Sequence, residues 1–591
     1  MKQKSFLSGI LLLCAVCAQA NNYTVTSPDG KLAVNVECKE GKAFYTVDYN
    51  GKQMLGASAL GLVANYGDFS QNLKMGALKS EKKHLAYKMT RIKKEKIEKD
   101  AYEATIGFIN SKKDSMTLRL HVSNNDIAYK YEMIRPKKDN PKSVIIYNEV
   151  SGFNFPEKTT TFLCPQITPM TGWERTKPSY EEEYTPDAPM NVKSQFGVGY
   201  TFPCLFKVGN DGWVLVSETG VSSAYPGCRL SDYEPGKGYT VAFPQKGENN
   251  GIGSEFAGIP LPGETPWRTI TVGSSLAPIV ETTIPYDVVE PLYEASQTYK
   301  PSRYTWSWLI WQDNSIARKK EMAWMKKIGV VGIKVDFFGG DKQETMKLYE
   351  DILSDANDYG LEVIFHGCTM PRGWERMYPN YVSSEAALAS ENVFFTDYHA
   401  KKEAFEMTMH PFSRNAVASF DWGGVMMNKY LSKDNKSRHQ RYTSDVFEMA
   451  TAITNQSSVN CICLYPNNLQ DVPQWELDWL KNVPTAWEDT KFIAGYPTKY
   501  AVVARKSSVE NGSGAALTAG RWFVGGLNAT DKPLALTLDL PMFAGKTVTY
   551  ITDQPKKKGE KFFTSVKKTL KVGKNGKAKV VIQPNGGIII E

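Results

Sequence analysis

Short runs in which apolar and polar residues alternate dominate the first half of the chain. The clearest runs are Lys31 to Glu37, Ala43 to Tyr49, Met116 to Val122, Ile127 to Met133 and Trp213 to Glu218. Alternation with a period of two is typical of strands that bury one face. Asp-Gly, Asn-Gly and Gly-Lys pairs separate the runs, and such pairs favour hairpin turns. Up to about Thr283, the pattern predicts a large antiparallel β-sandwich.

A different pattern begins near Pro301. The helical stretches and apolar runs that alternate here are Ile316 to Lys327, Val330 to Phe338, Lys342 to Asp358 and Leu361 to His366. Such alternation is typical of βα units with parallel strands. In a sheet or barrel of this kind, catalytic groups lie at the C-terminal ends of the strands. Asp336 and His366 occupy that position.

Alternating runs return after Pro497. They are Tyr500 to Arg505, Arg521 to Gly526, Leu534 to Leu540 and Lys577 to Gln583. These runs predict a small C-terminal β-sandwich, and 591 residues exceed what one hydrophobic core usually organises. We therefore expect three domains after a leader of residues 1–20: an N-terminal β-sandwich over 21–290, a central (β/α)8-type barrel over 291–492 and a β-sandwich over 493–591.

The N-terminus has the features of a secretory signal. Lys2 and Lys4 precede an apolar stretch from Phe6 to Val16, and the small-x-small triplet Ala18-Gln19-Ala20 follows. This order predicts export with cleavage after Ala20, and a periplasmic location. The apolar stretch is too short for a permanent membrane anchor, and no later segment reaches about 18 apolar residues. We expect no membrane insertion.

Charge and cysteine content argue against a nucleic-acid-binding protein and against a fold held together by disulfides. The formal net charge is +8, but lysines and arginines are spread among nearly as many acidic residues, so no nucleic-acid partner is expected. Past the leader, seven cysteines follow no regular spacing, which favours buried free thiols in a large enzyme. One disulfide among Cys164, Cys204 and Cys228 remains an alternative.

Candidate chemistry begins with the segment Gly332 to Phe338. Asp336 ends a run otherwise suited to a buried strand, which would hold its carboxylate rigidly at a cleft. The alternative is an Asp that caps the following helix. The next loop, Phe365 to Arg376, is rich in Gly, Pro and aromatic residues, as suits sugar binding, although a purely structural loop has the same composition.

Two further carboxylates, Glu385 and Glu391, end the segment that starts at Tyr378. Glycoside hydrolysis needs one carboxylic acid to protonate the leaving oxygen and a second carboxylate to attack or to activate water. A third carboxylate can serve a hard cation. Taken singly, either Glu carries little information.

Together these segments resemble glycoside hydrolase family 97, a family of exo-acting α-glycosidases. Three further blocks share the resemblance: Phe412 to Asn415, Phe420 to Trp422 and Asn482 to Lys491. The family divides into inverting α-glucosidases and retaining α-galactosidases. Retaining members have an Asp nucleophile where this chain has Asp336, and a Gly after the next strand's His where this chain has Gly367.

The resemblance also implies roles for the neighbouring residues. It makes Glu391 the general acid/base and gives the family's Ca²⁺ the ligands Glu385, Glu391 and a Glu from the N-terminal domain, which we assign to Glu181 in the stretch Ser179 to Tyr184. The candidate substrate-binding residues are Lys334, His366, Trp308 and Arg376. Activity is then a double displacement on terminal α-galactosides of an oligosaccharide or polysaccharide side chain.

Two departures from the family limit this inference. Only about two dozen residues separate Trp311 from Asp336, enough for one βα crossover, so we expect one or two early βα units to be missing from the barrel. Ser390 departs from the Gly- and Arg-containing pattern usual around the acid/base, which favours a shifted substrate preference such as β-L-arabinopyranosides. An inverting α-glucosidase and a catalytically weak glycan-binding protein remain alternatives, and we expect a monomer or small homo-oligomer.

Overall fold

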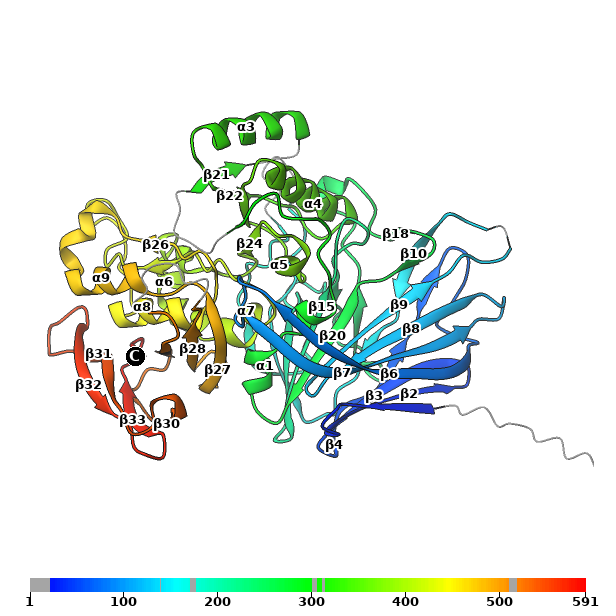
Figure 1. Cartoon of the computed structure of the whole chain (residues 1–591), viewed down its shortest axis with the longest axis horizontal. Helices are drawn as coiled ribbons and strands as arrows, with labels where there is room; N and C mark the ends of the chain where they lie inside the picture. The colour runs from blue at the N-terminus through cyan, green and yellow to red at the C-terminus, as the bar shows by residue number, and fades with distance from the viewer. Residues whose placement is uncertain (1–21, 139, 171–176, 300–305, 311–313, 510–517) are drawn as a thin grey trace, which may run out of the picture.

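The computed structural model describes residues 22–138, 140–170, 177–299, 306–310, 314–509 and 518–591, with the backbone alone over 306–310. The expected leader, residues 1–20, lies outside this range. Figure 1 shows a β-rich N-terminal region, a central part that carries most of the helices, and a β-rich C-terminal region on the far side of it. The order agrees with the predicted succession of β, α/β and β parts.

Antiparallel sheets build the N-terminal region. The four-stranded sheet contains β1 (Asn22–Thr26), β2 (Leu32–Lys39), β3 (Lys42–Tyr49) and β4 (Lys52–Leu60). The ten-stranded sheet runs in the order β13 (Thr185–Pro189), β12 (Thr159–Leu163), β14 (Cys204–Val208), β15 (Gly212–Thr219), β20 (Trp267–Gly273), β9 (Asp126–Met133), β8 (Ser115–Val122), β7 (Lys96–Ile109) and β6 (Lys74–Lys88), with β19 (Gly263–Glu264) beside β9. Buried side chains of both sheets form one apolar core, which confirms the predicted sandwich.

Smaller elements complete this region. They are the sheet of β18 (Ala257–Pro260), β10 (Ser143–Glu149) and β5 (Leu62–Ala64), the sheet of β11 (Gly152–Phe153), β17 (Tyr239–Ala242) and β16 (Arg229–Leu230), and the helices α1 (Ala277–Glu281) and α2 (Ile284–Asp287). The turn residues explain the hairpins. Asn50 and Gly51, with φ of 50° and 70°, join β3 to β4 with the two positive φ angles of a type I′ turn.

The central region contains a parallel sheet of four strands in sequence order. They are β21 (Trp306–Ile310), β22 (Gly332–Asp336), β23 (Glu362–Phe365) and β24 (Tyr381–Ser384), with α3 (Ser315–Lys327) between the first two and α4 (Gln343–Asp358) before the third. Ser384 makes a further parallel bridge to Phe420. The predicted βα units are therefore confirmed, with one helix between β21 and β22.

The predicted eight-stranded barrel is not confirmed. Within the described residues, the remaining parallel strands are a separate pair, β25 (Val425–Met426) and β26 (Ile462–Cys463). The other helices here are α5 (Trp374–Met377), α6 (Asp397–Met407), α7 (Arg414–Val417), α8 (Asp445–Thr454) and α9 (Gln474–Asn482). Over the part of the chain that is described, the sheet is thus open and does not close into a barrel.

Local sequence explains why α4 forms and how it packs. Met346, Tyr349, Leu353 and Ala356 recur at helical spacing, and all four are at most 1% exposed. The Tyr349 ring stacks on Phe338, which follows β22, and meets Phe365 at the end of β23 edge to face. This packing fixes the C-terminal ends of the two strands relative to each other.

A six-stranded antiparallel sheet and a two-stranded sheet form the C-terminal region. The sheet order is β27 (Trp487–Tyr496), β28 (Tyr500–Ser507), β29 (Trp522–Asn528), β34 (Gly587–Ile590), β31 (Thr547–Gln554) and β32 (Thr564–Lys571), and β30 (Leu534–Asp539) pairs with β33 (Lys577–Ile582). Val502, Val524, Leu538, Val580 and Ile588 belong to the core between them. The predicted β-sandwich is confirmed.

Two further expectations concern free cysteines and membrane-spanning helices. The seven cysteines past the leader are all free, so the alternative of a disulfide among Cys164, Cys204 and Cys228 is wrong. Of the helices in the described ranges, none combines the length and apolarity that crossing a membrane requires.

Candidate functional site

Three neighbouring parallel strands bring their C-terminal ends to one place. Asp336 is the last residue of β22, His366 follows β23 directly, and Glu385 follows β24 directly. The strands are adjacent in the sheet, so the three side chains form a row. Asp336 is 4% exposed, His366 5% and Glu385 0%. This is the placement expected for Asp336 and His366 from the sequence.

His366 lies between the two predicted catalytic carboxylates. Its Nδ1 is 3.2 Å from Asp336 Oδ2, and its Nε2 is 3.3 Å from Glu391 Oε1. The same Nε2 is 3.1 Å from Glu385 Oε1. One imidazole therefore joins the predicted nucleophile, the predicted acid/base and a predicted metal ligand.

The carboxylates around His366 decide its charge. Burial alone lowers the pKa of this imidazole, but Glu385 and the hydrogen bond with Asp336 outweigh burial and raise the pKa well above its ordinary value. Lys334 opposes that rise. The raised pKa favours the protonated, cationic imidazole, whose Nδ1–H then donates to Asp336 Oδ2.

Both glutamates hold protons more tightly than usual. Burial, and then the nearby charge of Glu181, raises the pKa of Glu385 to about 6, against the effect of His366. Burial raises the pKa of Glu391 to about 7; His366 lowers it, Glu385 raises it, and Lys334 lowers it again. A carboxyl group that keeps its proton near neutral pH suits a general acid.

The backbone around Asp336 is built to fit its carboxylate. Phe337 adopts a φ of 72°, and its N–H donates to Asp336 Oδ1 at 2.7 Å. Positive φ at a bulky residue is uncommon and concentrates at functional sites. Gly367 has a φ of 46°, and a Cβ there would lie 2.5 Å from Asp336 Oδ1. Position 367 must therefore be Gly while Asp336 occupies this place.

A tight loop contact positions Glu391. Ser390 Oγ lies 2.8 Å from the carbonyl oxygens of both Trp422 and Gly424, and its single hydrogen can donate to either of them. A Cβ on Gly423 would lie 2.8 Å from the Glu391 backbone nitrogen. Ser390, which departs from the family pattern, thus holds the acid/base segment against the loop 422–424.

The structure adds Asp421 to the site. Lys334 Nζ is 3.0 Å from Asp421 Oδ2, and the Asp421 N–H donates to the Ser384 carbonyl at 2.9 Å. Burial would raise the pKa of Asp421, but the Lys334 and His366 charges lower it below its ordinary value. Sequence reasoning named Lys334 but missed Asp421, although its position after Phe420 repeats the strand-end pattern of Asp336.

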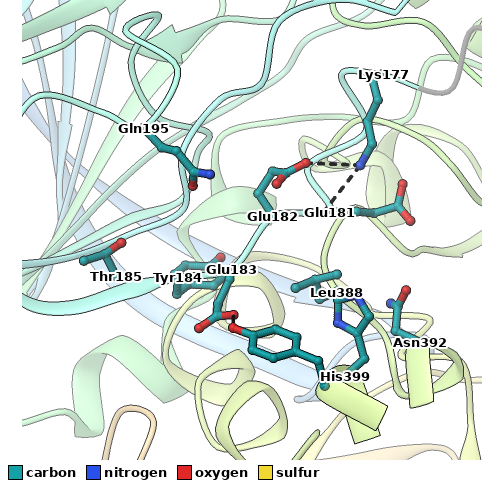
Figure 2. A pocket seen from close by; sticks show the side chains of 11 residues that line it. Lys177, Glu181, Glu182, Glu183, Tyr184, Thr185, Gln195, Leu388, Asn392 and His399 are labelled. Atoms are coloured by element: carbon teal, nitrogen blue, oxygen red, sulfur yellow. Dashed lines mark hydrogen bonds and ion pairs between the residues drawn. The ribbon is translucent and has the colours of Figure 1, made fainter. Parts of the chain in front are cut away.

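The stretch of three glutamates lies beside this row. Glu182 pairs with Lys177 at 3.3 Å, and Glu183 pairs with Lys402 at 2.6 Å. Glu181 instead accepts from Ser179 Oγ, and its carboxylate points away from Glu182 (Figure 2). Glu181 is also the nearby charge that raises the pKa of Glu385. These partners favour Glu181 as the member that faces the site.

A pocket of about 620 Å³ adjoins Glu181 (Figure 2). Its lining residues are Lys177, Glu181, Glu182, Glu183, Tyr184, Thr185, Gln195, Leu388, Asn392, Tyr398 and His399. Leu388 and Asn392 flank Glu391 in the sequence, so the pocket opens beside the acid/base segment. Its lining is mostly polar, but it does not include Asp336, His366, Glu385 or Glu391, so the pocket lies beside the catalytic row and is not the row itself.

The donor atoms fit a hard cation. Among the described residues, His366, Glu385 and Glu391 each offer one donor atom, and these atoms lie within 4.8 Å of one another. Glu385 Oε1 is buried and accepts no hydrogen bond. Buried carboxylate oxygens are the donors Ca²⁺ takes. The cluster contains two predicted ligands, Glu385 and Glu391, but has His366 where the prediction had Glu181, which lies outside that 4.8 Å group.

One predicted substrate-binding residue, Arg376, stands apart from this row. Arg376 donates to the Tyr286 carbonyl at 2.8 Å and to Glu290 Oε2 at 2.7 Å, and its guanidinium covers the Tyr87 ring. These contacts are with residues of the N-terminal region and lend no support to the predicted role of Arg376 in substrate binding. Trp308 pairs with Lys334 in the backbone register of β21 and β22, but its side chain lies outside the described residues.

Three family models match the chain in succession. "Glycosyl-hydrolase 97 N-terminal" matches residues 25–291, "Glycoside hydrolase 97" matches 295–387, and "Glycosyl-hydrolase 97 C-terminal, oligomerisation" matches 486–591. The second match contains Asp336, His366 and Glu385.

Two named relatives are similar over most of their length. A "Probable retaining alpha-galactosidase" of Streptomyces bingchenggensis is 22% identical over 89% of this chain and 86% of that protein. A "Retaining alpha-galactosidase" of Bacteroides thetaiotaomicron is 21% identical over all of both chains.

Solved structures extend the comparison. A "beta-arabinopyranosidase" is 46% identical, with a TM-score of 0.90 over 96% of this chain and 99% of that chain. A family 97 enzyme of a Pseudoalteromonas species, in complex with panose, has a TM-score of 0.79 over the same shares at 16% identity, and it supports the fold alone.

Proposed function

Because the chain belongs to glycoside hydrolase family 97, we propose that it is a retaining exo-glycosidase for terminal pyranosides with the galactose ring configuration. The observation that carries this proposal is the pairing of Asp336 with Gly367. A strand-end carboxylate occupies the space that any side chain at 367 would need. Inverting members of the family resembled by this sequence have their base, a Glu, at the position of Gly367. A side chain at 367 and the carboxylate of Asp336 exclude each other here, so an inverting arrangement has no support from this site.

The mechanism assigns one role to each carboxyl group. Asp336 attacks the anomeric carbon, while Glu391 gives its proton to the departing glycosidic oxygen. Water then enters, Glu391 accepts its proton, and attack on the glycosyl-enzyme ester frees Asp336. The two groups face opposite nitrogens of His366. We expect the two carboxyl groups to lie about 5 to 5.5 Å apart when a sugar is bound, as in retaining enzymes.

The neighbouring residues prepare this chemistry. The N–H of Phe337 orients the Asp336 carboxylate, and the His366 cation donates to its other oxygen. Burial raises the pKa of Glu391 to about 7, which favours the protonated acid near neutral pH, whereas a bound cation would lower that pKa. Lys334, paired with Asp421, presents a cation beside the sugar site and donates to ring hydroxyl groups in our proposal.

Calcium is the cation that these residues suit. Glu385 and Glu391 would hold it through carboxylate oxygens, and Glu181 of the N-terminal region would be a third ligand. When bound, the ion supplies a fixed positive charge that orients carboxylates and sugar hydroxyl groups. Burial and like charges on Glu385 are then compensated by the ion rather than by protons.

Two substrates fit the proposed ring configuration. α-Galactosides are favoured by the names of the two relatives with 21% and 22% identity. β-L-Arabinopyranosides, which lack only the hydroxymethyl group, are favoured by the 46%-identical β-arabinopyranosidase. We propose both, as terminal units of an oligosaccharide or polysaccharide side chain, with export to the periplasm and a small homo-oligomer as the working form.

A substrate screen tests the proposal. The mature chain is assayed with aryl α-galactoside, aryl β-L-arabinopyranoside and aryl α-glucoside, and proton NMR follows the anomer first released. We expect hydrolysis of one or both of the first two with retained configuration. Hydrolysis of the glucoside alone, or an inverted first product, would refute the proposal, and binding without turnover would identify a glycan-binding protein instead.

A further inference from the structure

Tyr180, the residue before Glu181, is bonded to the central region through its hydroxyl group. The hydroxyl donates to Asp341 Oδ2 at 2.9 Å and accepts from Arg372 Nη2 at 3.0 Å. Arg372 Nη2 also donates to Asp341 Oδ1 at 2.8 Å, which closes a ring of three groups. Burial, followed by the Asp341 charge, raises the pKa of Tyr180 well above its ordinary value, so the hydroxyl stays neutral.

Asp341 and Arg372 lie on the loops of the catalytic strands. Asp341 follows β22, which ends at Asp336, and Arg372 follows β23 and His366. The Tyr180 hydroxyl therefore fixes its own segment relative to the two strand ends that carry the nucleophile and the bridging imidazole. A shift of Tyr180 would shift Glu181 by a similar amount, because the two are adjacent in the chain.

The backbone conformation at Tyr180 directs the side chains of Tyr180 and Glu181 to different places. Tyr180 is 2% exposed and has a φ of 67°, a conformation that a residue with a Cβ rarely adopts. Glu181, the next residue, lines the pocket. The buried hydroxyl contacts thus hold a strained turn that places one side chain inward and the next one at the site.

The anchor is itself rigid. Arg372 Nε donates to Glu218 Oε1 at 2.5 Å, and Glu218 pairs with Arg268, which pairs with Glu149 at 2.6 Å. The side chains of all four residues are fully buried. A hydrogen-bonded chain of this kind resists displacement, because moving one member leaves a buried charge without its partner.

We propose that Tyr180 is a positioning residue that, through Asp341 and Arg372, holds the Glu181 carboxylate in reach of a cation bound by Glu385 and Glu391. This inference rests on the proposed function, since it assumes a bound Ca²⁺. It goes beyond that function because it makes the affinity for Ca²⁺ depend on a contact between the N-terminal and central regions. Groups that orient metal ligands typically change affinity by about 10- to 100-fold.

Calcium titration of the full mature chain tests the proposal. Isothermal titration measures the Ca²⁺ dissociation constant of wild type, Tyr180→Phe, Glu181→Gln and the double variant. We expect each single change to weaken binding by about 10-fold or more, and the double variant to bind no more weakly than Glu181→Gln. This non-additivity follows if Tyr180 acts only through Glu181. Saturating Ca²⁺ should restore most of kcat in Tyr180→Phe.

Tyr225→Phe is the matched control. Tyr225 is another buried tyrosine, and its hydroxyl lies 3.4 Å from Glu149 at the far end of the same chain of charges. We expect this variant to bind Ca²⁺ like wild type, and circular dichroism checks that all variants fold. Tyr180→Phe with wild-type affinity, or additive losses in the double variant, would overturn the proposal while leaving the glycosidase assignment intact. Wild type that binds no Ca²⁺ would overturn both the proposal and the calcium assignment.

Discussion

A Cβ atom at Gly367 would lie 2.5 Å from Oδ1 of Asp336. The two positions lie at the ends of neighbouring parallel strands, so the space for a side chain at 367 is the space that the Asp336 carboxylate fills. The presence of Asp at one position therefore requires Gly at the other. This relationship gives a physical reason for the pair of residues that marks retaining members of the family.

Gly367→Ala should inactivate the enzyme without unfolding it. The added methyl group must displace Asp336, and a misplacement of about 1 Å at a reacting group can cost about 10²-fold in rate. The left-handed backbone adds about 1–2 kcal/mol of strain. Gly329→Ala is the control, because Gly329 has a φ of 87° but no atom within 4 Å of its Cβ position. Equal losses of kcat/KM in both variants would contradict the steric account.

Removing the acid/base should affect poor leaving groups most. Glu391→Ala removes the group that protonates the glycosidic oxygen, a contribution of about 10²- to 10⁴-fold. An aryl glycoside whose phenolate leaves without a proton should lose far less in the step that forms the glycosyl-enzyme. Pre-steady-state rates for aryl leaving groups of graded acidity measure this difference. A loss that is the same for every leaving group would contradict the role of Glu391.

The pair of Lys334 and Asp421 should behave as one unit. Asp421→Asn leaves Lys334 without the carboxylate 3.0 Å away, and a hydrogen bond to a charged group contributes about 1.5–3 kcal/mol. We expect Lys334→Met, Asp421→Asn and the double variant to show coupling of about 0.5–3 kcal/mol in a urea double-mutant cycle. Both single variants should also lower kcat/KM. Additive effects on unfolding would show that the contact does not contribute.

Asp553 should make stability depend on pH at the junction with the C-terminal region. It accepts from Ser444 Oγ at 2.7 Å and from the Gly587 N–H at 2.9 Å, and burial raises its pKa to about 7. Between about pH 4 and 7 the folded state therefore binds one more proton than the unfolded state. Its contribution to stability is present below pH 4 and is lost as pH rises, by up to about 1.4 kcal/mol per unit.

Asp553→Asn tests this dependence, because Asn has the shape of the protonated acid but does not titrate. As pH rises from 4.5 to 7, the unfolding free energy of wild type should fall steadily relative to that of Asp553→Asn. Chemical denaturation at several pH values measures it. A difference that is constant over this range would refute the assigned titration.

Local sequence patterns predicted the parts of the site that lie at strand ends. Asp336 and His366 each end or follow an apolar run, and parallel strands carry such positions to one edge whatever the rest of the chain does. Glu181 was harder to choose among three neighbouring glutamates. Its choice is supported by the ion pairs of the other two, Glu182 with the nearby Lys177 and Glu183 with the distant Lys402.

The contacts that the sequence could not predict join residues that are far apart in the chain. Asp421 pairs with Lys334, and the short helix α5 directs Arg376 to Glu290. Neither pairing leaves a periodic trace in the sequence. The eight-stranded barrel was expected from βα alternation, but alternation predicts the type of unit and does not fix how many strands close the sheet.

Azide rescue of Asp336→Ala tests the central claim most directly. Removing the nucleophile opens space for a small anion on the face of the sugar opposite the leaving group. The account predicts that hydrolysis of an aryl α-galactoside nearly stops, that azide restores turnover, and that NMR identifies a β-galactosyl azide. An α-galactosyl azide, or activity that neither falls on substitution nor responds to azide, would contradict Asp336 as the nucleophile.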